Sequence, residues 1–550
     1  MEQKNSFFPE SVRDDRVRDY IAPVGIVMSG GAENEQNLIG ALATQMTLTP
    51  PAGCTLVRGG YVLLDFGREF SGGLKILVSK VESSTKNATL FIRYGESVTE
   101  ALTPVGKSGA TNDHATREFS LDVSFLSSNE TGESGLRFAY VSLEDGDAVE
   151  ISAILGVFCH STSEIVGTFE CSDKKLTKIW QTAAYTAYLC MQQYIYDGIK
   201  RDRLVWAGDL YTEMRTILAA VGPDESIRRT LKFLSDTTPD GNWMNGISSY
   251  SIWWLICVFD YAVATGDEEF LDDVRPKLFE LISRLTTEIG EDGAEELDGA
   301  RFVDWKIREN KEATHAGLQS LLKKAMSVGT RLCEMLDNRE LAAECRECEK
   351  ELSKHVPSHV GSKQAAALMA YSGLMSPIDA DGSVLSVGGP RGYSTFMSYF
   401  ILRAKAEAGN IAGALTDMRA YFGAMLDLGA TTFWEDFDIE LSQGGARIDL
   451  PVEDGGIDVH ADFGEHCYSG LRRSLCHGWA SGPCAFLSEY VLGVKQISPY
   501  EFTVKPDLGP LKWARGKYPT AYGEIEVEAR VANGKTVVKV KAPKGVKIRK

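Results

Sequence analysis

The sequence predicts a multidomain fold in which a long helical region lies between two β-rich regions. Up to about residue 168, short runs such as ATLFIRYGES and LRFAYVSLE alternate apolar and polar residues, which is typical of half-buried strands. From there to about residue 492, apolar residues recur at every third and fourth position, which indicates helices. After residue 494 the period returns to two. At 550 residues the chain is too long for one ordinary core, so we expect two to four domains.

Composition narrows the class of protein. Hydrophobic residues make up 44% and charged residues 24%, as in soluble globular proteins. The formal net charge of -18 argues against nucleic acid and anionic membrane as partners. No apolar stretch reaches the ~18 residues of a membrane span. The N-terminus lacks a basic start followed by an apolar run, so we expect a cytoplasmic protein, although a secreted or periplasmic one trimmed of its signal peptide would look the same.

The two flanking regions are each predicted to form a β-domain. Residues 1–168 are expected to form a β-sandwich with an irregular segment over the first ~50 residues, where GGAENEQNLIG is predicted to be a mobile or partner-dependent loop. Residues 494–550 are expected to form a small structural β-domain. Within it, Asn533-Gly534 between two alternating runs predicts a hairpin.

The middle region, residues 169–493, is predicted to contain about twelve helices. Those with a clear period fall at 250–264, 267–290, 311–337, 339–355, 363–372, 394–408, 411–427 and 480–492. Roughly 27 residues per helix and connection agree with ordinary helix and loop lengths. This arithmetic permits an (α/α)6 barrel and equally a solenoid of paired helices.

One stretch of this region, YIYDGIKRDRLVWAGDLYTE from Tyr194 to Glu213, concentrates the chemistry. Asp197, Asp202, Asp209 and Glu213 alternate there with Arg201, Arg203 and Trp206. Glycines within it predict a loop between two helices, and rigidly held loops often carry catalytic groups. Spaced carboxylates beside guanidiniums and an indole suit a sugar site. A surface ion-pair cluster at a helix entrance is the alternative.

The motif DGIKRDRLVWAGD resembles that of the α-L-rhamnosidases of glycoside hydrolase family 78. Further segments resemble the family in its order, namely IWWLICVFDYAVATGD, FVDWKI, THAGLQSLL, RGYSTFMSYFIL, GATTFWEDFD and SLCHGWASGPCAFLSEYVLGV. Together they cover roughly residues 168–494. The resemblance implies an (α/α)6 barrel over 169–493 that follows a β-sandwich. It also implies an inverting exo-glycosidase that removes terminal α-L-rhamnose from plant glycosides, flavonoids or polysaccharides.

The acid side of the reaction falls on this motif. Inverting hydrolysis needs a carboxylic acid and a carboxylate base roughly 6.5–9.5 Å apart. By resemblance, Asp202 occupies the position of the general acid, which is usually glutamate in the family, while Asp197 and Asp209 bind sugar hydroxyls. Arg201 would orient a carboxylate or bind a hydroxyl. Gly198-Ile199 replaces the commoner cysteine-proline, so the chain belongs to a divergent branch, and Asp197, Asp209 or Glu213 is the alternative acid.

The base side falls on GATTFWEDFD. Glu435 matches the family's general base, Trp434 would wall the water site and Asp436 would support the base. His477 in SLCHGW matches a family histidine near the base, although a core histidine bonded to the backbone is the alternative.

Aromatic side chains are expected to complete a sugar pocket. Trp206, Trp243, Trp254 and Trp305 lie in segments that resemble pocket-lining regions, and Asp304 could bind a hydroxyl. An apolar or aromatic wall would also contact the C5 methyl of rhamnose. For each tryptophan, a place in the core is the alternative.

No metal or cofactor is predicted. His460, Asp462, Glu465 and His466 raise the question of a cation, but they have neither zinc nor calcium-loop spacing, and the loop at the barrel mouth is the favoured interpretation. Eleven cysteines with a single CxxC, Cys345 and Cys348, indicate reduced thiols. The expected partner is a rhamnose-terminated carbohydrate, and a homodimer is allowed.

Two other functions remain open. One is a barrel glycosidase for a related sugar such as L-mannose or L-lyxose. The other is a non-catalytic rhamnoside-binding protein, which the aspartate at position 202 favours. Release of 4-nitrophenol from its α-L-rhamnoside would separate turnover from binding.

Overall fold

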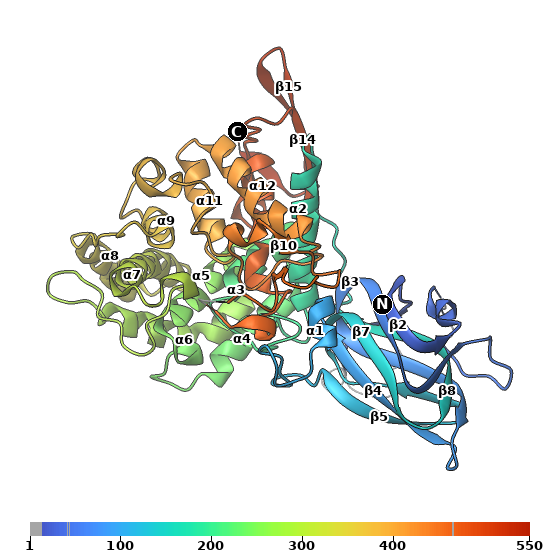
Figure 1. The fold of residues 1–550 in the computed structure, drawn as a ribbon. Helices are drawn as coiled ribbons and strands as arrows, with labels where there is room; N and C mark the ends of the chain where they lie inside the picture. Colours follow the sequence, from blue (N-terminus) through green and yellow to red (C-terminus); the bar gives the residue numbers. More distant parts are fainter. Residues whose placement is uncertain (1–13, 41, 43, 465–466, 550) are drawn as a thin grey trace.

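The computed structural model describes residues 14–40, 42, 44–464 and 467–549. Figure 1 shows a central helical body with a β-sheet domain on one side and a β-hairpin projecting from another. The fold class predicted from the sequence is confirmed. In the part of the chain that is described, no helix is long and apolar enough to cross a membrane.

The N-terminal domain is one eight-stranded sheet that curls around its own core. The strand order is β1-β8-β3-β7-β4-β5, and β2 and β6 also pair with β3. The strands are β1 Val17–Ile21, β2 Gly25–Glu33, β3 Cys54–Glu82, β4 Asn87–Gly95, β5 Glu118–Ser124, β6 Ser127–Glu130, β7 Ser134–Asp145 and β8 Ala148–His160. The long strand β3 pairs with both β7 and β8, so it belongs to both layers around the buried core.

The prediction of an irregular segment over the first ~50 residues is wrong for part of its length. Strand β1 pairs antiparallel with β8, and β2 pairs with β3. GGAENEQNLIG contributes the end of β2 and a short 3-10 helix, Glu35–Leu38. Neither face of β2 is fully buried, so its sequence shows no alternation. Pairing with β3, rather than burial, fixes this segment as a strand.

Two sets of helices form the barrel. Contacts between neighbours close a ring of α3, α5, α7, α9, α11 and α13, and the remaining long helices pack outside it. The inner helices are α3 Leu210–Ala220, α5 Ser248–Thr265, α7 Lys311–Met335, α9 Lys363–Ser372, α11 Ser398–Glu407 and α13 Gly482–Phe486. Outside them lie α2 Lys174–Cys190, α4 Glu225–Thr237, α6 Glu268–Thr286, α8 Arg339–Leu352, α10 Pro377–Ala380 and α12 Ile411–Asp427. A closed ring excludes the solenoid.

The C-terminal region forms two small sheets. One contains β12 Val494–Ser498, β13 Glu501–Val504 and β17 Lys547–Arg549, and the other has the order β16-β15-β14-β9. Its strands are β14 Trp513–Thr520, β15 Gly523–Ala532, β16 Lys535–Lys541 and β9 Thr168–Cys171, which comes from just before the barrel. The predicted hairpin at Asn533-Gly534 is confirmed, with φ of 52° and 74° at its two turn residues. It is the hairpin that projects in Figure 1.

Candidate active site

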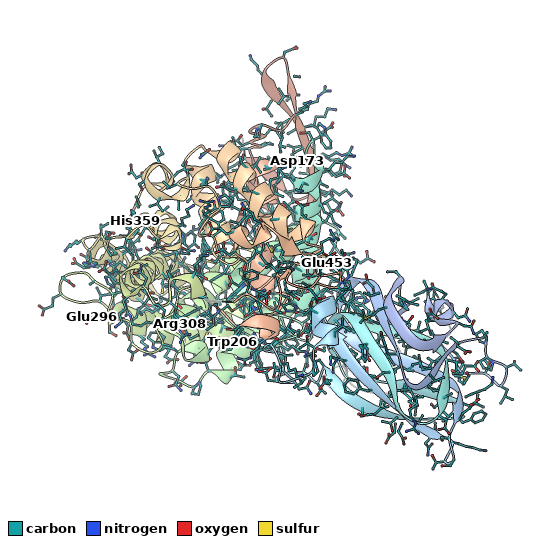
Figure 2. The ribbon with its side chains drawn as sticks, in the orientation of Figure 1. Asp173, Trp206, Glu296, Arg308, His359 and Glu453 are labelled. Atoms are coloured by element: carbon teal, nitrogen blue, oxygen red, sulfur yellow. The ribbon has the colours of Figure 1, made fainter. Side chains whose placement is uncertain are left out.

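A cavity of about 470 Å³ lies where the loops of the barrel meet. Its polar lining comprises Asp197, Asp202, Asp209, Glu435 and His477, and its aromatic lining comprises Trp206, Tyr250, Phe302, Trp305, Tyr468 and Trp479. Ile247, Ala300, Arg301 and Arg308 complete it. Figure 2 labels two residues of this lining, Trp206 and Arg308, on the lower part of the barrel.

The loop between α2 and α3 carries three of the four carboxylates, as predicted from its sequence. The Asp197 carboxylate accepts hydrogen bonds from the backbone amides of Asp202 and Leu204, both at 3.0 Å. The carbonyl of Asp197 accepts one from the amide of Gly478 at 2.7 Å. Asp197 therefore holds the loop in shape and joins it to the segment that carries His477.

Arg201 connects the two predicted catalytic carboxylates. Its Nη1 lies 2.5 Å from Asp202 Oδ1, and its Nη2 lies 3.4 Å from Glu435 Oε2. Its Nε donates to the carbonyl of Arg472 at 2.7 Å, and the Tyr468 ring covers the guanidinium at 3.7 Å. The side chain is only 2% exposed, so a fixed cation separates the two acids.

Glu435 is held from several directions. Its Oε2 accepts the backbone amide of Ser474 at 2.9 Å, and its Oε1 accepts the thiol of Cys467 at 3.0 Å. The Thr395 hydroxyl and the Trp479 indole N–H both donate to its backbone carbonyl. The carboxylate therefore has one orientation, with an edge at the cavity.

Burial shifts the pKa values of three other side chains in the cavity, namely Asp197, Asp209 and His477. Burial, and then the neighbouring Asp202, raise the pKa of Asp197 to about 7. Burial and Asp197 raise the pKa of Asp209 well above its ordinary value, while burial and Arg201 lower that of His477. Near neutral pH Asp209 is therefore protonated, Asp197 is partly protonated and the imidazole of His477 is neutral. These are donors and acceptors for hydroxyls.

His477 lies among the carboxylates but is not hydrogen-bonded to them. Its Nε2 is 3.6 Å from Asp197 Oδ2 and 3.9 Å from Glu435 Oε1, and its Nδ1 is 3.8 Å from Asp209 Oδ1. These distances are longer than hydrogen bonds. Nδ1 is buried without a partner among the described residues. The core-histidine alternative predicts a backbone partner for this ring, which the described residues do not provide.

Five predicted substrate-binding residues do not line this cavity, namely Arg201, Trp243, Trp254, Asp304 and Trp434. Arg201 contacts two of the carboxylates that do line it. Trp254 is 0% exposed and donates to the carbonyl of Leu231, so it is a core residue. The indole of Trp243 donates to Asp298. Asp304 accepts the Ser394 hydroxyl at 2.7 Å, and burial raises its pKa to about 7.

Trp434 and Glu213 lie behind the cavity instead of lining it. The Trp434 ring is buried and packs edge-on against Phe437. Glu213 is buried in α3, and any side chain at Gly478 would collide with its carboxyl group. Glu213 was suggested as an alternative general acid. Its carboxyl group is buried and does not line the cavity, so it does not reach a ligand there.

Several residues near the cavity were not anticipated. Arg301 and Arg308 flank the FVDWKI segment, and Tyr468 lies next to Cys467 in the segment that leads to His477. His114 comes from the N-terminal domain, and its Nε2 lies 3.7 Å from Asp202 Oδ1. The flanking arginines offered a sequence signal, since both lie within four residues of Trp305. His114 offered none, because its proximity to Asp202 depends on how the two domains pack.

A group of possible metal ligands lies beside the site. Glu96, Glu100 and His460 bring three ligand atoms together. The ammonium of Lys200 already lies there, 2.9 Å from Glu96 Oε2 and 3.1 Å from Glu100 Oε1. His460 Nδ1 meets the Ser97 hydroxyl and its Nε2 meets the carbonyl of Arg473. The residues present therefore do not fit a metal; Glu465 and His466 lie outside the described residues.

Two family models match the chain. Residues 164–366 match the bacterial α-L-rhamnosidase 6-hairpin glycosidase domain, and residues 493–549 match the bacterial α-L-rhamnosidase C-terminal domain. Both models describe domains of bacterial α-L-rhamnosidases. The family predicted from the sequence motifs is therefore confirmed. No curated protein sequence matches the chain.

Solved rhamnosidases share this fold. A glycoside hydrolase family 78 rhamnosidase of Bacillus sp. GL1 is 21% identical, with a TM-score of 0.74 over 94% of this chain and 55% of that one. A Klebsiella oxytoca rhamnosidase with rhamnose bound is 20% identical, with a TM-score of 0.67; the match covers 87% of this chain and 96% of that one. A Streptomyces avermitilis α-L-rhamnosidase complexed with L-rhamnose is 15% identical, with a TM-score of 0.69; the match covers 90% of this chain and 50% of that one. This chain thus spans about half of the Bacillus and Streptomyces proteins.

Proposed function

We propose that the protein is an inverting exo-α-L-rhamnosidase in which Asp202 is the general acid and Glu435 the general base. The observation that carries the proposal is the contact of both carboxylates with one buried guanidinium at the cavity. Through Arg201 the two contacting oxygens lie at most about 8 Å apart, which is compatible with the roughly 6.5–9.5 Å of inverting pairs.

In the proposed reaction, Asp202 gives its proton to the glycosidic oxygen as the bond to C1 breaks. Glu435 takes a proton from a water molecule, whose oxygen attacks C1 from the opposite face. The products are the released alcohol and rhamnose of inverted configuration. Proton return between the two carboxylates through solvent restores the enzyme for the next turnover.

The other cavity residues would bind the sugar. Asp197 and Asp209, whose pKa values are raised, would donate to and accept from ring hydroxyls together with neutral His477. Trp206, with the Tyr250 ring edge-on at 6.0 Å, offers an apolar wall for the C5 methyl group. The cavity of about 470 Å³ that these side chains line has room for a terminal sugar.

Turnover of 4-nitrophenyl α-L-rhamnoside tests the proposal. We expect release of 4-nitrophenol, and much slower release from the α-L-mannoside and α-L-lyxoside. Rhamnose binding by calorimetry without any release would instead indicate the non-catalytic rhamnoside-binding protein. Faster turnover of another glycoside would indicate a barrel glycosidase for a related sugar. The homodimer and the cytoplasmic location stay predictions from the sequence.

A further inference from the structure

We infer that the natural substrate carries a carboxylate on the sugar to which the terminal rhamnose is attached, and that Arg308, supported by Arg301, recognises it. This inference rests on the proposed function and deepens it. A uronic acid is the chemical class that combines a pyranose ring with such a carboxylate.

Arg308 is a cation placed beside an aromatic platform. It follows the short 3-10 helix Trp305–Ile307, is exposed to solvent and lines the cavity. Its guanidinium lies 5.0 Å from the centre of the Trp305 ring. No carboxylate pairs with it within the described ranges, whereas most arginines around the site have such a partner. Its planar set of N–H donors is therefore free for an incoming carboxylate.

Arg301 lies on the same wall, and its position is fixed from behind. Both of its terminal nitrogens contact the carboxylate of Glu295, which is fully buried, and Nη1 also donates to the carbonyl of Leu297 at 2.9 Å. His315 Nδ1 shares the same carboxylate at 2.6 Å. Arg301 is still 40% exposed. It adds positive potential to the wall, while Arg308 supplies unused donors.

The carboxylates on the cavity floor do not cancel this attraction. The guanidinium of Arg201 lies between Asp202 and Glu435 and offsets negative charge there, and the raised pKa values of Asp197 and Asp209 keep much of their charge off near neutral pH. Glu309 and Glu312 lie on the outer side of Trp305, in a separate hollow of the surface, and Lys306 beside them pairs with Asp438. An anion can therefore approach the Arg308 side of the cavity.

The geometry also separates the two sugar positions. Rhamnose would occupy the floor, with Asp197, Asp209 and His477, and its leaving oxygen would face outward. Trp305 would stack on the ring of the next sugar, as aromatic residues do in carbohydrate sites. Arg308 beside that indole then meets the edge of this second ring, where a uronic acid has its carboxylate.

Two matched disaccharides test the inference, an α-L-rhamnosyl-galacturonic acid and its methyl ester, which differ by one negative charge and one methyl group. We expect kcat/KM to be roughly 10- to 100-fold higher for the acid, as a hydrogen-bonded charge pair supplies. Arg308→Gln should bring the acid-to-ester ratio close to one, and Arg301→Gln should lower it less. Arg346→Gln is the matched control, since this exposed arginine of α8 pairs with Glu334 away from the cavity.

The outcomes separate this inference from the proposed function. Equal kcat/KM for acid and ester in the wild-type protein, or an unchanged ratio in Arg308→Gln, overturns the uronate while leaving a rhamnosidase that cleaves the nitrophenyl substrate. No turnover of 4-nitrophenyl α-L-rhamnoside overturns both. A ratio that falls in Arg308→Gln and not in Arg346→Gln supports the uronate.

Discussion

Arg201 gives the two proposed catalytic carboxylates different surroundings although both contact it. Asp202 is bound by one nitrogen of Arg201 at 2.5 Å and lines the cavity near His114 of the N-terminal domain. Glu435 has a longer contact with Arg201 and takes further donors from Ser474 and Cys467. The base is thus fixed by the barrel, whereas the acid depends on the loop that carries it.

Replacing the proposed base tests its role. Glu435→Gln should lower kcat roughly 10²- to 10⁴-fold, because the amide keeps the shape of the side chain without its basicity. Rhamnose binding, measured by calorimetry, should change little. Glu440→Gln, an exposed glutamate of the same segment, is the control and should keep wild-type kcat. Near-normal turnover in Glu435→Gln would assign the base to another residue.

Replacing the proposed acid should give an effect that depends on the leaving group. Asp202→Asn should strongly reduce hydrolysis of rhamnosides with alcohol leaving groups and reduce that of 4-nitrophenyl α-L-rhamnoside much less, since nitrophenolate needs little protonation to depart. Steady-state kinetics on both substrates would measure this. Equal losses on the two would transfer the role to Asp197, which lines the same cavity and whose pKa of about 7 lets it hold a proton.

At the residue scale, the sequence was most informative where spacing and residue type acted together. Asp197, Asp202 and Asp209 share one loop, so their convergence on a cavity follows from local structure. Trp243 and Trp254 could not be separated from Trp206 and Trp305, since residue type alone does not show whether an indole faces the core or the cavity. Tyr468 and His114 reach the site through contacts between distant segments, which no local pattern contains.

Among the elements, the catalytic loop depends on contacts with the N-terminal domain. Lys200, next to Arg201, is buried between Glu96 at the end of β4 and Glu100 in α1, Val98–Leu102. Its ammonium also donates to the carbonyls of Leu471 and Arg473. The β-sheet domain therefore positions the loop that carries the acid.

Lys200→Met should consequently lower kcat more than it raises KM, because the loop loses its anchor while the sugar contacts remain. It should also lower the Tm, since it leaves two buried carboxylates without their cation. Lys200→Arg should restore part of kcat. Kinetics on 4-nitrophenyl α-L-rhamnoside together with thermal unfolding would measure both effects. Wild-type kcat in a folded Lys200→Met protein would contradict the proposed role of the domain contact.

The long elements of the barrel could be predicted, and the short ones could not. Helices with one buried stripe, such as α8 and α12, begin at the predicted residues because their apolar period is strong. The predicted helix 480–492 is instead a 3-10 turn, the five-residue α13 and a π-turn, Leu487–Val491. Every residue of that stretch is buried, so periodicity carries no information there.

For the whole molecule, buried carboxyl groups make stability depend on pH. Asp304 has a pKa of about 7 in the folded protein against an ordinary value of 3.8. Between these two values the unfolded chain has lost the proton that the folded chain keeps, so the contribution of Asp304 to stability falls as pH rises. The loss amounts to about 1.4 kcal/mol per pH unit.

Asp304→Asn should remove this dependence. The Tm of the variant relative to wild type should rise by a few degrees between pH 5 and pH 7, because the amide cannot ionise. The comparison isolates Asp304, since other titrating groups contribute equally to both proteins. Thermal unfolding followed by circular dichroism would measure it. A Tm difference that does not change with pH would mean that Asp304 ionises near its ordinary pKa in the folded protein.

The arrangement of the whole molecule combines a closed helical ring, a loop held by a second domain and a cavity with two carboxylates on one cation. We propose that these carboxylates act in a single displacement. Proton NMR during hydrolysis of 4-nitrophenyl α-L-rhamnoside identifies the first anomer released before mutarotation. A single displacement at C1 should release β-L-rhamnose first. Initial release of α-L-rhamnose would mean that the anomeric configuration is retained and would rule out the single displacement.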